Sequence, residues 1–134
     1  MRRRAAGPLL LSLAFAGCEG TDRGLPPRYR RIDVPEARLD SAEAWARGRK
    51  LFLENCALCH GERADGRGAR REAFGRTPAD FTDLSWQSRT SPRRAFFVIR
   101  EGVRGTAMPS WKSLEEADAW DLVAYLRRAA ETPR

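Results

Sequence analysis

The chain has 134 residues, and its 25 lysines and arginines against 18 aspartates and glutamates give a formal net charge of +7. That length fits one small domain with attachments, and the balance of 42% hydrophobic and 32% charged residues is ordinary for a globular domain. The composition excludes collagen-like, coiled-coil and disulfide-scaffold chains, and no apolar run is long enough for a permanent membrane span. The scarce residues are three cysteines, two methionines and one histidine.

The N-terminus has the order of a secretory signal. Residues 2–4 are three arginines, residues 5–16 form a short apolar stretch, and Gly17-Cys18 follows. Twelve apolar residues are too few to cross a bilayer as a helix, whereas a basic start, a short apolar region and small residues are typical of an export signal. We predict that residues 1–17 are removed on export; a buried N-terminal helix is the alternative.

The end of this signal resembles a bacterial lipobox in Phe15-Ala16-Gly17-Cys18, although Phe15 stands where leucine is usual. The resemblance implies cleavage before Cys18 and lipidation of that cysteine. Several acyl chains on one residue anchor a domain stably. The alternative leaves Cys18 as a free, reactive thiol in an oxidising compartment. We therefore expect a bacterial lipoprotein, anchored to a membrane on its periplasmic side.

Loss of the signal lowers the net positive charge, which bears on whether the protein binds nucleic acid. Removing 17 residues with their three arginines leaves 117 residues and a formal charge of +4. The remaining basic residues are scattered among acids: Arg47, Arg49 and Lys50 lie between Glu43 and Glu54, and Arg127 and Arg128 follow Asp118 and Asp121. Such interleaving is typical of solvated helix faces, and no nucleic-acid motif accompanies it. We expect no nucleic-acid partner.

Residues 18–40 contain several glycines and prolines, many charges and no sustained periodicity. This composition predicts a flexible linker with a reach of roughly 25 Å. The expected organisation is a signal over residues 1–17, a lipid-anchored flexible linker over 18–40, and a folded domain over 41–134.

Three helices are expected in the folded part. The first runs from about Ser41 to Asn55, and the second starts at the cap Ser91-Pro92 and ends before Gly102. A terminal helix is expected over about 114–130, with Ser113 and Glu116 as a capping box. Residues 61–89 show little periodicity and no convincing strand, so the fold class is all-α with long loops that need something to pack on.

The sequence Cys56-Ala57-Leu58-Cys59-His60 indicates a group on which the long loops could pack. Two cysteines separated by two residues and followed by histidine are the attachment signature of c-type haem. The thiols add across two vinyl groups on one side of the porphyrin, which places His60 under the iron. The alternatives are a zinc half-site, a thioredoxin-like pair and a disulfide; zinc would need further ligands, and a thioredoxin-like motif a βαβ context.

Met108 is the candidate for the second axial ligand. His60 is the single histidine, and Met108 is the single methionine once the signal is removed. It lies 48 residues beyond His60, in Gly105-Thr106-Ala107-Met108-Pro109, and Pro109 restricts it to extended backbone geometry. A loop of that length can return to the far face of a haem. A core methionine is the alternative.

These features together resemble a class I mono-haem cytochrome c over residues 41–128. The resemblance implies three main helices and long loops wrapped round one covalent haem c. It also implies that the first and last helices cross through Gly48 and Phe52 on one side and Leu122 and Tyr125 on the other.

The same resemblance assigns further residues around the haem. The turn over residues 61–68 would follow the haem, and the carbonyl of Pro78 would orient His60. Trp86 and Arg89 would hydrogen-bond a haem propionate, with a core tryptophan and a surface arginine as the alternative.

Iron held by His60 and Met108 has no open position for a substrate, and the thioether favours the ferrous state. The resulting hypothesis is an electron carrier rather than an enzyme. It would pass electrons from a donor complex or dehydrogenase to an oxidase or reductase. The alternatives are a fixed haem subunit of a larger respiratory complex, and a haem enzyme or gas sensor with an open sixth position.

Overall fold

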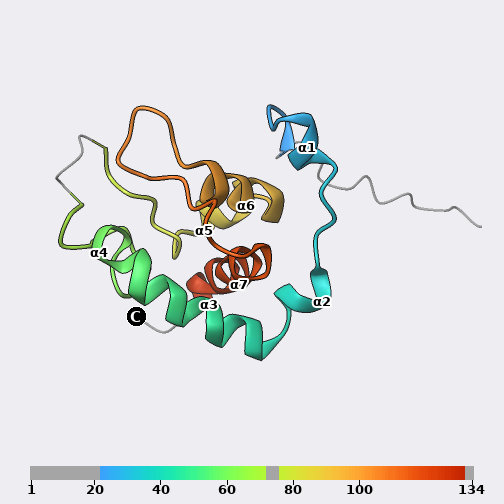
Figure 1. The fold of residues 1–134 in the computed structure, drawn as a ribbon. Helices are drawn as coiled ribbons and strands as arrows, with labels where there is room; N and C mark the ends of the chain where they lie inside the picture. The colour runs from blue at the N-terminus through green and yellow to red at the C-terminus, as the bar shows by residue number, and fades with distance from the viewer. Residues whose placement is uncertain (1–21, 72–75, 132–134) are drawn as a thin grey trace, which may run out of the picture.

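The computed structural model describes residues 22–71 and 76–131, and within these ranges it contains helices and no β-strand. The α-helices in chain order are α1 (Pro27–Arg30), α2 (Glu36–Leu39), α3 (Ala42–Asn55), α4 (Ala57–His60), α5 (Leu84–Arg89), α6 (Pro92–Glu101) and α7 (Glu116–Arg127). Figure 1 shows α3, α6 and α7 grouped at the centre, with α4 at one end and α1 and α2 at the other. The all-α prediction is confirmed.

The first long helix forms where the sequence predicts it. The Ser41 side chain accepts a hydrogen bond of 3.0 Å from the backbone N–H of Ala44, which caps the start of α3. Ala44, Gly48 and Phe52 recur at four-residue spacing and are buried, so they form the stripe that faces the rest of the domain.

Helices α3 and α7 cross at Gly48. A Cβ atom at Gly48 would lie 1.9 Å from the carbonyl oxygen of Asp121 and 3.0 Å from Cβ of Tyr125. The rings of Phe52 and Tyr125 fill the next part of the contact, with centroids 5.0 Å apart, and Leu122 is also buried. The predicted crossing of the first and last helices is confirmed.

The second long helix has the predicted caps. The Ser91 side chain accepts from the N–H of Arg94 at 3.0 Å, Pro92 occupies the first turn, and Gly102 ends α6 at a φ of +70°. The buried face of α6 meets α7 where Phe96 stacks on Trp120, with ring centroids 4.2 Å apart.

Two details of the helix prediction are wrong. Helix α7 begins at Glu116, and its cap residue Glu115 makes no side-chain cap bond, so Ser113 and Glu116 form no capping box. A turn displaces the start of the helix, since the N–H of Leu114 donates to the Trp111 carbonyl. Helix α5 was not predicted; the Asp83 side chain caps it by accepting from the N–H of Ser85 at 2.9 Å.

The prediction of a flexible linker over residues 18–40 is wrong for residues 22–40, which we call the strap. Leu25, Tyr29 and Leu39 are buried in the common core. Tyr29 packs its ring edge-on against Phe97 of α6 at a centroid distance of 4.9 Å. The three apolar residues are widely spaced among prolines and arginines, so they form no periodic pattern that would predict a packed segment. Residues 1–21, with the predicted signal and Cys18, lie outside the described residues.

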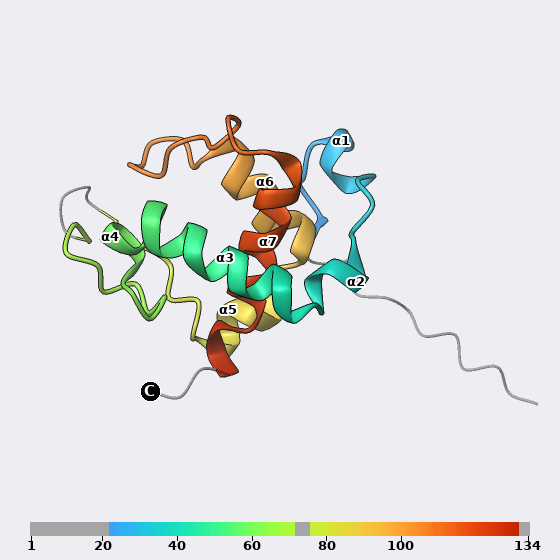
Figure 2. The same cartoon turned by 60° about the horizontal axis from the view of Figure 1, so that its bottom comes forward.

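Polar contacts fasten the strap to α6. Asp22 accepts from the Ser91 hydroxyl and pairs with Arg93, and the Arg93 Nε donates to the Ile32 carbonyl at 2.9 Å. The hydroxyl of Tyr29 donates to Glu101 at 2.5 Å. The strap therefore runs along the domain surface as a fixed element, visible as the blue and cyan segment in Figure 2.

A buried carboxylate ties the strap to both long helices. Asp121 on α7 is fully buried, and Arg38 of the strap binds its two oxygens at 2.7 and 2.9 Å. Arg47 of α3 donates to the same carboxylate at 2.8 Å. Asp121 was predicted to lie on a solvated helix face; that prediction is wrong, because two guanidinium groups compensate the cost of burying the charge.

Replacing Arg38 by glutamine is expected to lower the free energy of unfolding by about 2 kcal/mol, because the buried carboxylate keeps one guanidinium partner in place of two. The strap should also be cut faster in limited proteolysis. The matched control is Arg31→Gln, at an exposed position of the strap. It should change the free energy of unfolding by no more than about 0.5 kcal/mol and should leave the rate of cleavage unchanged. Equal unfolding curves for the two variants would contradict the role of the Arg38–Asp121 pair.

Among the described residues, no helix combines the length and apolar character needed to cross a membrane.

Candidate haem site

The attachment motif forms one short helical turn directly after α3. The N–H groups of Cys59 and His60 both donate to the Cys56 carbonyl, at 3.1 and 2.9 Å. Residues three and four apart lie on the same side of a helix, so the turn gathers the two thiols and the imidazole on one side. All three side chains are half-buried.

The described residues bear on the alternatives for this motif. Cys56 and Cys59 are both free thiols, so no disulfide joins them. Within residues 22–71 and 76–131, no group of three or more His, Cys, Asp or Glu side chains is arranged to hold a metal ion. Burial, with a smaller contribution from Cys59, raises the pKa of the Cys56 thiol to about 12. The residues therefore present two free thiols and an imidazole, which is the set that covalent haem attachment requires.

The imidazole of His60 is held in one tautomer. Its Nδ1 lies 3.2 Å from the carbonyl oxygen of Ala79. A carbonyl can only accept, so Nδ1 carries the proton and Nε2 keeps its lone pair for a metal. Burial lowers the pKa of His60, which keeps the imidazole neutral at neutral pH. Pro78 was predicted to supply this carbonyl; the structure assigns it to Ala79, the next residue.

Phe81 supports the same imidazole from the side. Its ring stacks on His60 with centroids 4.8 Å apart and planes 29° apart. Phe52 and Trp86 pack edge-on against Phe81 at 6.1 and 4.8 Å. Trp86 is thus half-buried against the ring of Phe81, while Arg89 at the end of α5 is exposed. Their contact with a propionate stays a prediction.

Phe81→Leu is expected to lower the free energy of unfolding by about 1 kcal/mol, since it removes the ring contacts with His60 and Trp86 but keeps an apolar side chain. Thermal unfolding monitored by circular dichroism would measure this change in the free energy of unfolding. Leu84→Ala, at an exposed position three residues away, is the control and should change stability little. A larger loss for Leu84→Ala than for Phe81→Leu would contradict this packing.

A loop over residues 61–70 closes the C-terminal end of α4. The N–H groups of Gly66, Gly68 and Arg70 donate to the carbonyls of His60, Cys59 and Leu58 at 2.8, 3.1 and 2.9 Å. These bonds satisfy the carbonyls that a short helix leaves unpaired. They fix the orientation of the motif, in the place where a turn after the haem was expected.

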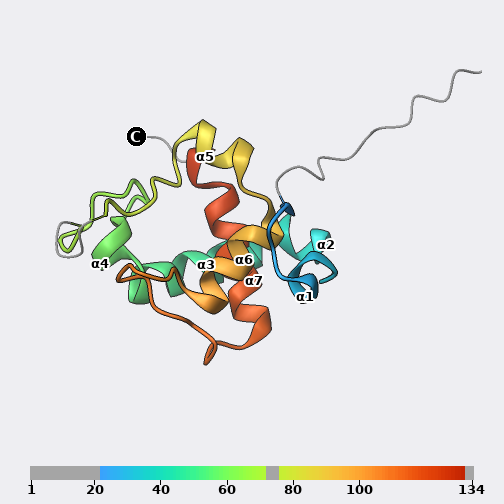
Figure 3. The ribbon, with the colours of Figure 1, turned by 90° about the horizontal axis from the view of Figure 1, so that it is seen from above.

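The loop that carries Met108 connects α6 to α7. The Met108 carbonyl accepts from the N–H of Val103 at 3.1 Å, and its own N–H donates to Thr106 at 3.2 Å. A Cβ atom at Gly102 would lie 2.6 Å from the Met108 carbonyl oxygen, so glycine is needed for this close return of the chain. Figures 1, 2 and 3 all show the loop at the same end of the molecule as α4. The loop that carries the half-buried Met108 therefore lies at the motif's end of the molecule, and ligation of iron by Met108 stays a prediction.

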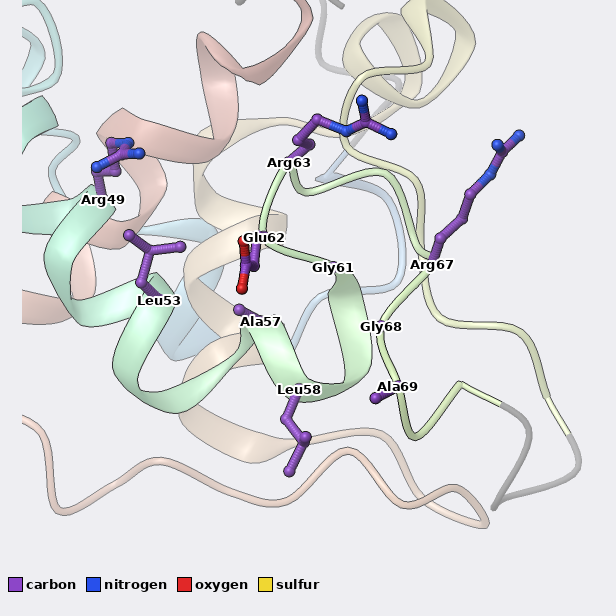
Figure 4. Close-up of a pocket in the computed structure, with 10 residues that line it drawn as sticks. All are labelled: Arg49, Leu53, Ala57, Leu58, Gly61, Glu62, Arg63, Arg67, Gly68 and Ala69. Atoms are coloured by element: carbon purple, nitrogen blue, oxygen red, sulfur yellow. The ribbon is translucent and has the colours of Figure 1, made fainter.

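A pocket of about 780 Å³ is lined by residues of α3, of α4 and of the loop over residues 61–69. Arg49, Leu53, Ala57 and Glu62 line one part of it, and Figure 4 shows Leu58 pointing away from them. His60, Phe81 and Met108 do not line this pocket. It is thus distinct from the site that His60 faces.

The comparison with protein families decides the class. Residues 43–126 match the family described as Cytochrome C oxidase, cbb3-type, subunit III. The chain belongs to this cytochrome c family. Membership agrees with the motif and the all-α fold, and it implies a covalently bound haem c.

Known relatives agree with this assignment. The cytochrome is 32% identical over 114 residues to a thiosulfate dehydrogenase of Stutzerimonas stutzeri (strain A1501), a match that covers 79% of this chain and 33% of that protein. The chain therefore spans about a third of the length of this curated relative.

Solved structures resemble the fold. A chain of the Kuenenia stuttgartiensis reducing HAO-like protein complex Kustc0457/Kustc0458 superposes with a TM-score of 0.61 at 26% identity, over 73% of this chain and 49% of the other. The KustC0563 c-type cytochrome superposes with a TM-score of 0.50 at 30% identity, over 60% of this chain and 93% of the other.

Proposed function

We propose that this cytochrome is a membrane-tethered carrier of single electrons, with one haem attached to Cys56 and Cys59 and held by His60 and Met108. Family membership supports haem-based electron transfer. When bound, the haem supplies a one-electron iron couple whose potential is set by the axial ligands. The protein would bind no substrate at the iron.

The observation that carries this proposal is the tautomer of His60. The bond from Nδ1 to Ala79 leaves the lone pair on Nε2 for a metal, and the stacked Phe81 ring restricts rotation of the imidazole. A ligand whose ring cannot turn keeps the same geometry in both oxidation states of the iron. Reorganisation is then small, which is what an electron carrier requires.

The second axial position is proposed for Met108 on chemical grounds. A thioether is a soft ligand, and it raises the reduction potential of a histidine-ligated haem. The Met108 N–H donates to the Thr106 hydroxyl and the Met108 carbonyl accepts from the Val103 N–H, and these bonds hold Met108 at its place in the loop. The same loop also carries the amine of Lys112, but that side chain is paired with Glu101 at 2.7 Å, which leaves Met108 as the soft ligand of the loop.

Mass spectrometry of the protein purified from the membrane fraction would test haem attachment and tethering together. The expected result is one haem on the peptide that contains Cys56 and Cys59, and a lipid on a peptide that begins at Cys18. A haem-free Cys56–Cys59 peptide would overturn the cofactor assignment, and an unmodified Cys18 would overturn the tether alone.

The relatives favour a second candidate, a fixed haem subunit of a larger redox complex. The matching family is described as a subunit, and one similar structure is part of a protein complex. Under this reading the cytochrome would stay bound to its donor or acceptor after mild detergent extraction. Native gel electrophoresis with haem staining would separate a free carrier from a large haem-stained assembly.

A further inference from the structure

We propose that the start of the strap is a docking surface for anionic phospholipid headgroups, and that it turns the haem end of the cytochrome away from the membrane. The proposal rests on the lipid anchor at Cys18 proposed above. Its evidence is the charge of the strap, its fixed contacts with the domain, and its place relative to α4.

The first twelve described residues of the strap are basic. Residues 22–33 contain four arginines against two aspartates, Asp22 and Asp33. Asp22 is already paired with Arg93. Arg23, Arg30 and Arg31 are exposed, and no ion pair with another described residue holds their side chains in place. These guanidinium groups are therefore available to an anionic partner.

The strap cannot swing away from the domain. Arg93 binds the Ile32 carbonyl, and Arg94 of the same helix donates to the Arg23 carbonyl at 2.8 Å. These contacts hold both ends of the basic segment against α6 and bring two more arginines beside it. The basic surface is thus part of the rigid domain, and its contact with a membrane would orient the whole molecule.

The distance to the proposed anchor is short. Asp22 is four positions after Cys18, and four residue-to-residue steps span at most about 14 Å in any conformation. A lipid on Cys18 would hold the strap within that distance of the headgroups. A lipid anchor combined with a basic patch binds anionic membranes much more strongly than either feature alone.

The motif that would hold the haem is at the other end of the molecule. Figures 1, 2 and 3 show α1 and α2 at the end opposite to α4 and the Met108 loop. A strap pressed on the membrane would therefore direct α4 toward the aqueous phase. The haem would exchange electrons with partners there, and not through the bilayer surface.

The test is arginine labelling of the haem-loaded, lipidated protein in vesicles. Phenylglyoxal labelling is read by mass spectrometry in phosphatidylcholine vesicles with and without phosphatidylglycerol. Arg30 and Arg31 should react at least roughly three-fold more slowly when phosphatidylglycerol is present, because headgroup phosphates occupy them. In about 0.5 M salt, where screening shortens to a few Å, the difference should disappear.

Exposed arginines at the α4 end serve as internal controls. Arg63 and Arg104 should react equally on both kinds of vesicle. As a matched pair of variants, Arg31→Glu should reduce the protection of Arg30, whereas Arg104→Glu should leave it unchanged. Protection of Arg63 and Arg104 would place the opposite end on the membrane and overturn the proposal. Equal labelling of Arg30 on both vesicles would also overturn it, in favour of an acidic protein as the occupant.

This design distinguishes a failure of the lipid-anchor proposal from a failure of the docking-surface proposal. A protein without lipid would not incorporate into either kind of vesicle, which would overturn the anchor. Co-sedimentation of that soluble holoprotein with phosphatidylglycerol vesicles would still support the surface, and its absence would overturn the surface as well. The visible spectrum of the same sample reports the haem independently of both.

Discussion

Replacement of Met108 by alanine is expected to leave the haem attached but to open its sixth position. The thioether favours the ferrous state, so its loss should lower the reduction potential by on the order of 0.1–0.2 V, a fraction of the ~0.8 V that axial ligands span. Carbon monoxide should then bind the reduced protein rapidly at neutral pH. Redox titration and visible spectroscopy with carbon monoxide measure the two effects.

The control for this variant is Val103→Ala, on the exposed side of the same loop. It shortens an apolar side chain but keeps the backbone bond from residue 103 to the Met108 carbonyl, so potential and ligation should not change. An unchanged near-infrared and visible spectrum in Met108→Ala would contradict the axial assignment. Rapid carbon monoxide binding by the unmodified cytochrome would instead favour a haem enzyme or gas sensor.

Gly48→Ala is expected to cost about 3 kcal/mol or more of the free energy of unfolding. The new Cβ would lie 1.9 Å from a backbone oxygen of Asp121 and 2.5 Å from the carbonyl carbon. Backbone atoms cannot rotate away, so α3 and α7 must separate, and overpacking of this kind costs more than the roughly 1 kcal/mol that alanine gains in helix propensity. Denaturant unfolding of the haem-loaded protein measures the difference.

The same helix offers a matched position for comparison. Ala46 lies two residues away and is exposed, so Ala46→Ser adds one atom where nothing must move. It should change the free energy of unfolding by no more than about 0.5 kcal/mol. If Gly48→Ala proved as mild as Ala46→Ser, the close crossing of α3 and α7 would be refuted.

Separation of α3 and α7 has a further consequence for the candidate site. Phe52 contacts Tyr125 on one side and Phe81 on the other, and Phe81 stacks on His60. The packing of the helix crossing is therefore continuous with the support of the proposed iron ligand. A change at Gly48 is expected to broaden the spectral features of the haem along with its effect on stability.

The sequence by itself determined the features that depend on neighbours in the chain. The spacing of Cys56, Cys59 and His60 predicts the haem-attachment motif. The first helix is expected to start at Ser41, and the local signals at Ser91 and Gly102 predict both ends of the second. The resemblance to class I cytochromes c also brought Gly48 and Tyr125 into the predicted crossing. These signals are local because hydrogen bonds within a helix join residues only a few positions apart.

Only the tertiary structure decided which distant groups meet. Arg38 binds Asp121 across 83 positions, and the His60 imidazole contacts Ala79 across 19. No local pattern marks a backbone carbonyl as a ligand support, and a lone aspartate in a helix looks the same in sequence whether it is solvated or paired in the core. An acid within the apolar run of α7 was the one available signal for Asp121. The strap was misjudged for the same reason, since its three buried anchors gain their partners only when α6 and α7 pack beside them.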